Sequence, residues 1–515
     1  MGIKVSEDLF QLIRSMSPAE KRAFKLLSER HERQSGNNYI QLFDAIAAQE
    51  SFDEEALRQQ FAGRAFLRNF SEAKAYLYRI LLRSLRFSQG PDAPETELRE
   101  MLDHLEILHA KGLSSQAEKQ AKAGLEKAQK LDLHAFSFEF HKWRRRLAKQ
   151  RGGKGLQENL AKIGAEEATA LACLQVEAEL RDRMGRIQVM LQQQVDLRDQ
   201  AHSQALEEIW GHPVFQTPPT AAGFHALLSY YHGLAYYHHL KHDWARSCMA
   251  WESVVGTFEA FPVHIQHTPD QYINALVTLL DARLTLRQFD AFQAELPKLQ
   301  AQHVAEAVVA ARAALLGQHL TLRWALISGH LDEGLRNLPT LEAAMVKHKK
   351  YMSVSLEMSL LFNICSLFFL TERYPEAQRY INAVLNRPHL PIREDLVDAL
   401  RLLELVGRYA RGQMDLLEHL LKAQERRLRQ VTTKPAFLVT VVKAFHRLMD
   451  AADAAETRQL QAELLRELES MPAEARISGH EELYWWARSR VEGRSIHELL
   501  LARTDEDLGD AEQCD

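Results

Sequence analysis

The sequence contains few residues that interrupt helices and few cysteines. Its 23 glycines and 15 prolines make up about 7% of 515 residues, whereas roughly 12% is usual, so we expect long helices. The four cysteines are Cys173, Cys248, Cys365 and Cys514. Their wide spacing indicates neither a disulfide framework nor a thiolate zinc site. They fit a reducing compartment, and we expect a cytoplasmic protein.

Long apolar runs and a strong charge of one sign are also absent. The most apolar run, residues 364–370, is far shorter than the roughly 20 residues of a membrane-spanning helix, and the first residues lack the apolar core of a secretory signal. We therefore expect no membrane association. The formal net charge is only -5, so a charged partner would have to meet a local patch.

The common catalytic motifs are missing. No glycine-rich loop ends in Gly-Lys-Ser/Thr, no dinucleotide fingerprint follows a strand, and no His-Glu-x-x-His occurs. His497-Glu498 lacks the second histidine of that last motif. We expect a protein that is not an enzyme and needs no cofactor.

Histidines are concentrated in one segment, at His225, His232, His238, His239 and His242. His238 and His242 stand four residues apart, a spacing that allows one metal to be shared on a helix face. A metal site needs three or four ligands, however, and the sequence fixes no third one. We expect no metal and interpret these histidines as polar aromatic side chains of a helix.

Prolines divide the chain, because proline cannot continue a helix. Pro91 and Pro94 close a first block, none occurs in residues 95–212, and Pro213 begins a second cluster. We predict five segments: a helical module (1–90), long degenerate hairpins (91–212), repeats (213–470), capping helices (471–503) and a disordered acidic tail (504–515).

The first segment carries a clear helix start. Ser17-Pro18-Ala19-Glu20 has the residues of a capping box with proline at the first helical position. The apolar phases predict helices over 9–15, 18–29, 39–49, 53–61 and 71–87. With Leu9-Phe10-Gln11-Leu12-Ile13 and Tyr76-Leu77-Tyr78, this block resembles the N-terminal part of a family of bacterial repeat proteins that has no characterised activity. The resemblance implies a fold and no function.

Residues 222–262 carry the pattern of a tight helical hairpin: Gly233, Tyr236, Ala245 and Met249 supply a small, an aromatic, a small and a large side chain. Two antiparallel helices approach closely only where one side chain is nearly absent. The small residue recurs at Ala291, Gly334 and Ala377, at intervals of 46, 43 and 43 residues. This pattern, over about residues 96–430, resembles tetratricopeptide repeats. We predict an all-α fold, an α-solenoid of tetratricopeptide-like antiparallel hairpins after an N-terminal helical module.

The tetratricopeptide resemblance implies a non-enzymatic scaffold that binds a protein or peptide along the concave face of the first helices. The family's ligand-facing positions fall on Leu227, Tyr230, Leu234, Tyr237, His319, Arg323, Phe362 and Phe369. The lysine and asparagine that clamp a peptide carboxylate in this family are missing here. Only His319 with Arg323 could approach an anion. The alternative is that these side chains, the phenylalanines above all, are buried core.

Residues 141–157 contain seven lysines or arginines and no acid. The candidates for phosphate contacts are Lys142, Arg144, Arg145, Arg146 and Lys149, because basic clusters bind nucleic-acid backbones. The alternative function is therefore a nucleic-acid-linked regulator whose repeats sense a ligand. A solvated helix face explains the same charges without a partner.

Aromatic residues also gather near the end of the chain, at Tyr484-Trp485-Trp486. The last unit of a repeat array needs a cover for its apolar face. We interpret these residues as part of that cap, with a partner-binding surface as the alternative.

Overall fold

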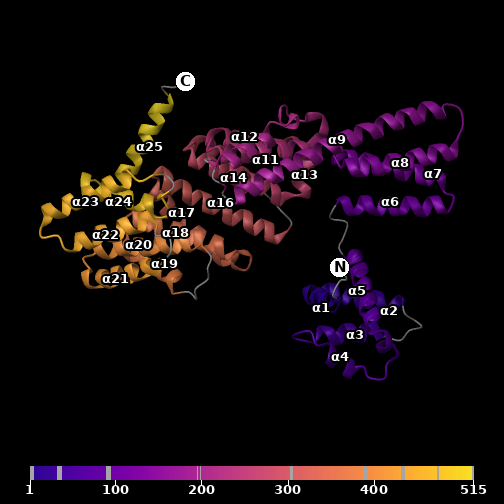
Figure 1. Cartoon of the computed structure of the whole chain (residues 1–515), viewed down its shortest axis with the longest axis horizontal. Coiled ribbons are helices and arrows are strands. Elements are labelled where there is room, and N and C mark those ends of the chain that lie inside the picture. Colours follow the sequence, from indigo (N-terminus) through magenta and orange to yellow (C-terminus); the bar gives the residue numbers. More distant parts are fainter. Residues whose placement is uncertain are drawn as a thin grey trace. The chain divides into compact units, whose positions relative to one another are not determined.

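The computed structural model describes residues 5–31, 38–88, 94–193, 195, 197, 199–301, 306–386, 393–430, 435–472 and 475–512. Within these ranges every regular element is a helix, so the all-α prediction is confirmed (Figure 1). The chain forms two compact units, Met1–Ala170 and Leu171–Asp515. Their boundary falls inside the long helix α9 (Leu156–Gln192) and not at a proline.

The first unit begins with five α-helices and one short 3-10 helix that correspond to the five predicted helices. They are α1 (Val5–Ser15), α2 (Pro18–His31), α3 (Asn38–Ala47), α4 (Glu54–Gln60), η1 (Ala65–Asn69) and α5 (Phe70–Ser88). The capping box before α2 is confirmed. The Ser17 amide donates to Glu20 Oε2 at 2.7 Å, and the Glu20 amide donates to Ser17 Oγ at 3.3 Å. Hydrogen bonding of the Glu20 carboxyl group to the Ser17 amide and to the Ser17 side chain lowers the pKa of Glu20.

The first unit continues with α6 (Pro94–Ala110), α7 (Ser114–Lys130), α8 (His134–Arg151) and the start of α9. Helix α7 packs against both α6 and α8. Gly124 makes the close approach between α7 and α8 possible, because a Cβ there would lie 2.2 Å from the Phe140 ring. Phe140 and Ala117 are both fully buried in this packing.

The second unit contains sixteen described α-helices and 3-10 helices between the end of α9 and α23. They are α10 (Gln200–Trp210), η2 (Pro213–Phe215), η3 (Thr220–Ala222), α11 (Gly223–Leu240), α12 (Trp244–Ala260), α13 (Pro262–His267), α14 (Pro269–Thr285), α15 (Phe289–Gln300), α16 (Ala307–Ser328), α17 (Leu331–Lys347), η4 (Lys349–Tyr351), α18 (Val354–Leu370), α19 (Tyr374–Leu385), α20 (Glu394–Ala410), α21 (Met414–Gln430) and α22 (Ala436–Met449). Sequential helices pack in pairs, and α14, α16, α18 and α20 also pack against one another in that order.

A left-handed residue recurs at the tight turns of the second unit and reproduces the predicted period. It occurs at His242, Arg287, Gly329, Glu372 and Gly412, at intervals of 45, 42, 43 and 40 residues. In four of these turns the next amide donates back across the helix end, as from Arg373 to the Phe368 carbonyl at 2.8 Å. This bonding is that of a Schellman cap. The feature that repeats with this period is therefore the turn that joins the two helices of each pair.

The small residues that we expected at the helix crossings have different environments. Gly334 and Ala377 are buried as predicted, and a Cβ on Gly334 would lie 2.9 Å from Leu367. Gly233 is buried too, but it makes room for the Phe215 ring of η2 and not for α12.

The prediction for Ala245 is wrong, because that side chain is exposed. The small residue of α12 that contacts α11 near this turn is the buried Ser247, whose hydroxyl donates to the Ala235 carbonyl of α11 at 3.0 Å. Ala291 is half-buried. The contact between α11 and α12 thus uses a position two residues further along α12.

Three helices close the chain: α23 (Ala454–Glu469), α24 (His480–Glu492) and α25 (Ile496–Glu512). Helix α24 packs against α18 and α20, and α25 packs against α16 (Figure 1). Trp485 and Trp486 are buried in these contacts. Helix α25 continues to Glu512, into the segment for which we predicted a disordered tail, and residues 513–515 lie outside the described residues.

Candidate functional site

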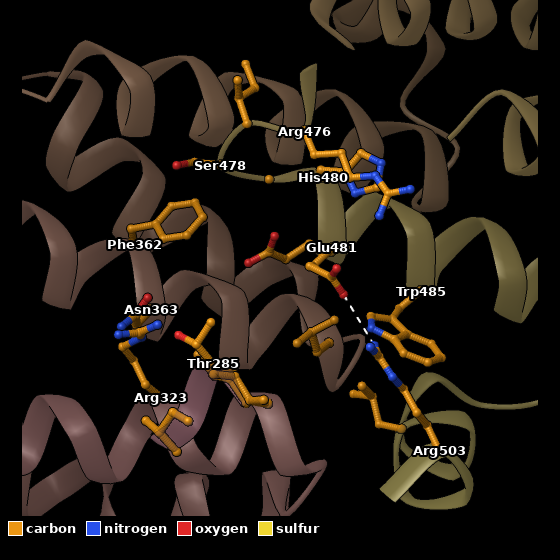
Figure 2. A pocket seen from close by; sticks show the side chains of 18 of the residues that line it. Thr285, Arg323, Phe362, Asn363, Arg476, Ser478, His480, Glu481, Trp485 and Arg503 are labelled. Atoms are coloured by element: carbon orange, nitrogen blue, oxygen red, sulfur yellow. Dashed lines mark ion pairs between the residues drawn. The ribbon is translucent and has the colours of Figure 1, made fainter. Parts of the chain in front are cut away.

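A cavity of about 470 Å³ lies in the second unit, where the C-terminal helices meet the earlier ones (Figure 2). Its walls come from the C-terminal ends of α14 and α16, from α18, from residues 476–479, and from α24 and α25. Four arginines line it: Arg287, Arg323, Arg476 and Arg503. The sequence places these groups up to 216 positions apart, and only the return of α24 and α25 brings them together.

Arg476 has only neutral hydrogen-bond partners. Its Nε donates to the Met471 carbonyl at 2.9 Å and its Nη2 to the Glu469 carbonyl at 3.2 Å. These two acceptors are neutral, and none of the ion pairs among the described residues includes Arg476. Arg476 thus caps the end of α23 and leaves a cationic group at the cavity.

Two of the other cavity arginines have acidic neighbours. Arg503 lies 3.7 Å from Glu481 (Figure 2) and 5.5 Å from the centre of the Trp485 ring. Arg323 forms an ion pair with Asp281 of α14. Asp281 and Glu481 therefore balance the positive charges of Arg323 and Arg503.

Glu482 is the buried acid of the cavity wall. Its Oε1 accepts a hydrogen bond from the Ser366 hydroxyl at 2.5 Å, and burial raises the pKa of its carboxyl group. A raised pKa favours the uncharged form. Glu482 therefore ties α24 to α18 and contributes less negative charge to the cavity than an exposed glutamate would.

His480, the first residue of α24, is 5% exposed. Its Nε2 lies 3.1 Å from the Leu468 carbonyl, and its Nδ1 has no partner among the described residues. Burial lowers the pKa of His480, so the ring is neutral near pH 7. Because a carbonyl only accepts, Nε2 carries the proton and Nδ1 is a hydrogen-bond acceptor.

The residues of the predicted partner face have different environments: some line the cavity, some are buried in the core and some are half-buried. Arg323 and Phe362 line the cavity. Tyr230, Phe362 and Phe369 are 7%, 9% and 1% exposed and belong to the core. The buried alternative is thus confirmed for both phenylalanines and for Tyr230. The half-buried members of the predicted face are Leu227, Leu234, Tyr237, His319 and Arg323.

Besides Arg323, which pairs with Asp281, two of these half-buried residues already have partners. Tyr237 stacks on Trp210 with ring centres 4.3 Å apart, and its hydroxyl donates to Glu207 at 3.2 Å. His319 Nδ1 lies 3.4 Å from Asn363 Nδ2, and burial lowers the pKa of His319 to about 4. A neutral His319 adds no positive charge beside Arg323, so of the pair that we expected to approach an anion only Arg323 is charged.

The basic segment is largely neutralised by acids of the same unit. Arg144 and Arg145 of α8 pair with Glu166 and Glu167 of α9. Lys142 pairs with Glu139 of the same helix. Arg146 lies over the Trp143 ring, and Lys149 is exposed. Glu166 and Glu167 come from a later helix and Glu139 lies just before the segment, so residues 141–157 alone do not reveal these acids.

The histidine segment lies mainly within aromatic packing. His232 is stacked with Tyr236 and lies edge-on to Trp251, and burial lowers its pKa to about 4. Over the part of the chain that the structure describes, no three or more histidine, cysteine or acidic side chains are grouped to hold a metal ion.

Sequence reasoning identified Arg323 and Phe362 but missed Arg476, His480 and Arg503. We interpreted Tyr484-Trp485-Trp486 as an end cap, and Trp485 is in fact a wall of the cavity. A helix-initiating His-Glu-Glu after Gly479 is ordinary in a sequence. Nothing local therefore marks these residues as part of a site.

No family model, curated protein or solved structure matches this chain. The tetratricopeptide resemblance consequently depends on the residues quoted for it. Among the helices of the described ranges, none combines the length and the apolar character needed to cross a bilayer.

Proposed function

We propose that this protein is a non-enzymatic, cytoplasmic scaffold that binds a protein or peptide on the first-helix face of a tetratricopeptide-like solenoid. That face is the one to which α14, α16, α18 and α20 contribute. The ordered packing of these four helices and the period of the left-handed turns support the repeat architecture. Architecture alone does not identify a ligand, because the same arrays serve many assemblies.

The observation that carries the proposal is that this face already holds helices of the same chain. Helix α24 lies against α18 and α20 and is joined to α18 by the Ser366–Glu482 hydrogen bond, and α25 lies against α16. A surface that buries two helices has the apolar character and the shape to accept a polypeptide segment. Near α11, beyond the contacts of α24 and α25, the face still offers the half-buried Leu227 and Leu234.

The test is position-specific crosslinking in the native cell. A photo-crosslinking amino acid at Leu227 or Leu234 should give a discrete adduct with one partner. The matched controls are Met249 of α12 and Val346 of α17, which are 64% and 78% exposed on second helices. Equal adduct yields at the control positions, or adducts only there, would show that the first-helix face is not the binding surface.

The environment of the basic segment gives less support to the alternative function, a nucleic-acid-linked regulator. Arg144 and Arg145 are engaged with Glu166 and Glu167, which leaves fewer cations to contact phosphates. If a basic patch nevertheless binds nucleic acid, affinity must fall steeply with salt. Affinity that survives Arg144, Arg145 and Arg146 changed to glutamate would remove this alternative.

A further inference from the structure

We propose that the cavity between α14, α16, α18, α24 and α25 binds a small organic anion. The ligand would have a compact apolar body with an oxyanion group and a neighbouring hydrogen-bond donor. This site shares α14, α16 and α18 with the polypeptide-binding face proposed above, but it lies away from Leu227 and Leu234 and needs no macromolecular partner.

The size of the cavity fits a small molecule. A volume of about 470 Å³ lies within the range of roughly 300–1,000 Å³ that is typical of small-molecule sites. Phe362 and Trp485 supply aromatic surface on two sides of the space (Figure 2). Such walls bury an apolar body while a few polar groups set its orientation.

The charge of the lining favours an anion. Four arginines and two glutamates line the cavity, and the raised pKa of Glu482 reduces the negative share. Arg476 has only neutral carbonyl partners, so an oxyanion would be its first charged partner. Hydrogen bonds from arginine to carboxylate or phosphate are stronger than those between neutral groups.

His480 implies that the ligand also carries a hydrogen-bond donor. It is 5% exposed, it lines the cavity, and its Nδ1 is an acceptor without a partner among the described residues. Arg476 is close enough to His480 to affect its protonation, and the two lie at one end of the cavity (Figure 2). Leaving a buried acceptor unpaired is unfavourable. A ligand that bonds Arg476 through an oxyanion can offer an adjacent hydroxyl or N–H to His480.

The experiment is a calorimetric titration of the full chain with four probes. Mandelate carries a phenyl ring, a carboxylate and an adjacent hydroxyl group. Phenylacetate lacks the hydroxyl, mandelamide lacks the charge, and phenyl phosphate replaces the carboxylate by a phosphate. We expect mandelate to bind at least about tenfold more tightly than mandelamide and about threefold to tenfold more tightly than phenylacetate.

Two variants of the cavity and one control complete the test. Arg476→Gln and Arg503→Gln should each weaken mandelate binding about tenfold or more. Arg447→Gln, which removes a surface ion pair with Glu463 on the same unit, should leave it unchanged. Melting temperatures of all three variants report whether the fold is retained, and the second cavity variant serves if Arg476→Gln unfolds the end of α23.

The outcomes separate clearly. Phenyl phosphate binding more tightly than mandelate would support the site and assign phosphate as its oxyanion, whereas the reverse order assigns a carboxylate. Equal affinity for mandelate and mandelamide, or unchanged affinity in both cavity variants, would overturn the proposal. Because no macromolecule is present, these results do not depend on the crosslinking test.

Discussion

Individual buried histidines connect the packing of this protein to its pH dependence. His264 is 5% exposed and stacks on Phe224 with ring centres 3.7 Å apart. Burial lowers its pKa to about 4, and the same cause lowers the pKa of His232 and His319 to about 4. These side chains are neutral in the folded protein at a pH where they would be protonated in the unfolded chain.

The free energy of unfolding should therefore decrease as the pH falls from about 6.5 to about 4. In this window the unfolded state binds more protons than the folded state, so acid favours unfolding, and the full stability is present above pH 6.5. His264→Phe keeps the aromatic stack and removes one titrating group. We expect the variant to lose roughly 2–3 kcal/mol less than the wild type between these limits.

Urea unfolding at a series of pH values measures this difference. His104→Phe, at an exposed position of α6, controls for the added ring. Identical pH profiles for wild type and His264→Phe would show that burial of His264 does not contribute to acid sensitivity.

At the scale of secondary-structure elements, the left-handed turns determine where the first helix of each pair ends and the second begins. Gly412 adopts φ +69°, and a Cβ there would meet no atom within 4 Å. His242, Arg287 and Glu372 occupy the same conformation without being glycine. A side chain in this region costs about 1 kcal/mol or more, so these turns are held by the packing of the helices on either side.

Two glycine-to-alanine changes should have opposite effects on stability. Gly412→Ala should lower the free energy of unfolding by about 1 kcal/mol, because the new Cβ is strained by the left-handed backbone. Gly256→Ala, within α12 and with open space around the new methyl group, should raise it by up to about 1 kcal/mol. Thermal or urea unfolding of both variants tests the pair. The same sign for both changes would contradict the assignment of Gly412 to a left-handed turn.

At the scale of the second unit, α25 is held by a small set of contacts. The Thr504 hydroxyl donates to the Ser328 carbonyl at 2.9 Å and accepts from Arg287 at 3.2 Å. Gly329 allows the approach, since a Cβ there would lie 3.0 Å from the Leu500 backbone. These contacts complete one wall of the cavity and cover part of α16.

Thr504→Val should loosen α25 selectively. The methyl group that replaces the hydroxyl cannot donate to Ser328 or accept from Arg287, so two buried polar groups lose a partner. We expect amide hydrogen exchange over residues 496–504 to become about tenfold faster while α18 keeps its protection. Thr504→Ser retains the hydroxyl and should resemble the wild type. Equal protection in the Val and Ser variants would mean that this hydrogen bond does not hold α25.

Local patterns were sufficient for the helical class, the five N-terminal helices, the capping box at Ser17 and the period of the hairpins. Each depends on neighbours within a few residues, where proline, glycine and apolar spacing act directly on the backbone. The same reasoning erred at Ala245, because which small residue lies at a helix crossing depends on the rotation of α12 against α11. That rotation is decided by contacts such as the one from Ser247 to Ala235.

Tertiary packing alone determined the residues that line the cavity and the burial of the residues on the predicted partner face. Arg476, His480 and Arg503 approach Arg323 and Phe362 only because α24 and α25 return to pack on α16, α18 and α20. Likewise, the charges of Arg144 and Arg145 are neutralised by acids on another helix. Contacts between residues far apart in the chain depend on how whole apolar faces are buried together, and no local spacing encodes that arrangement.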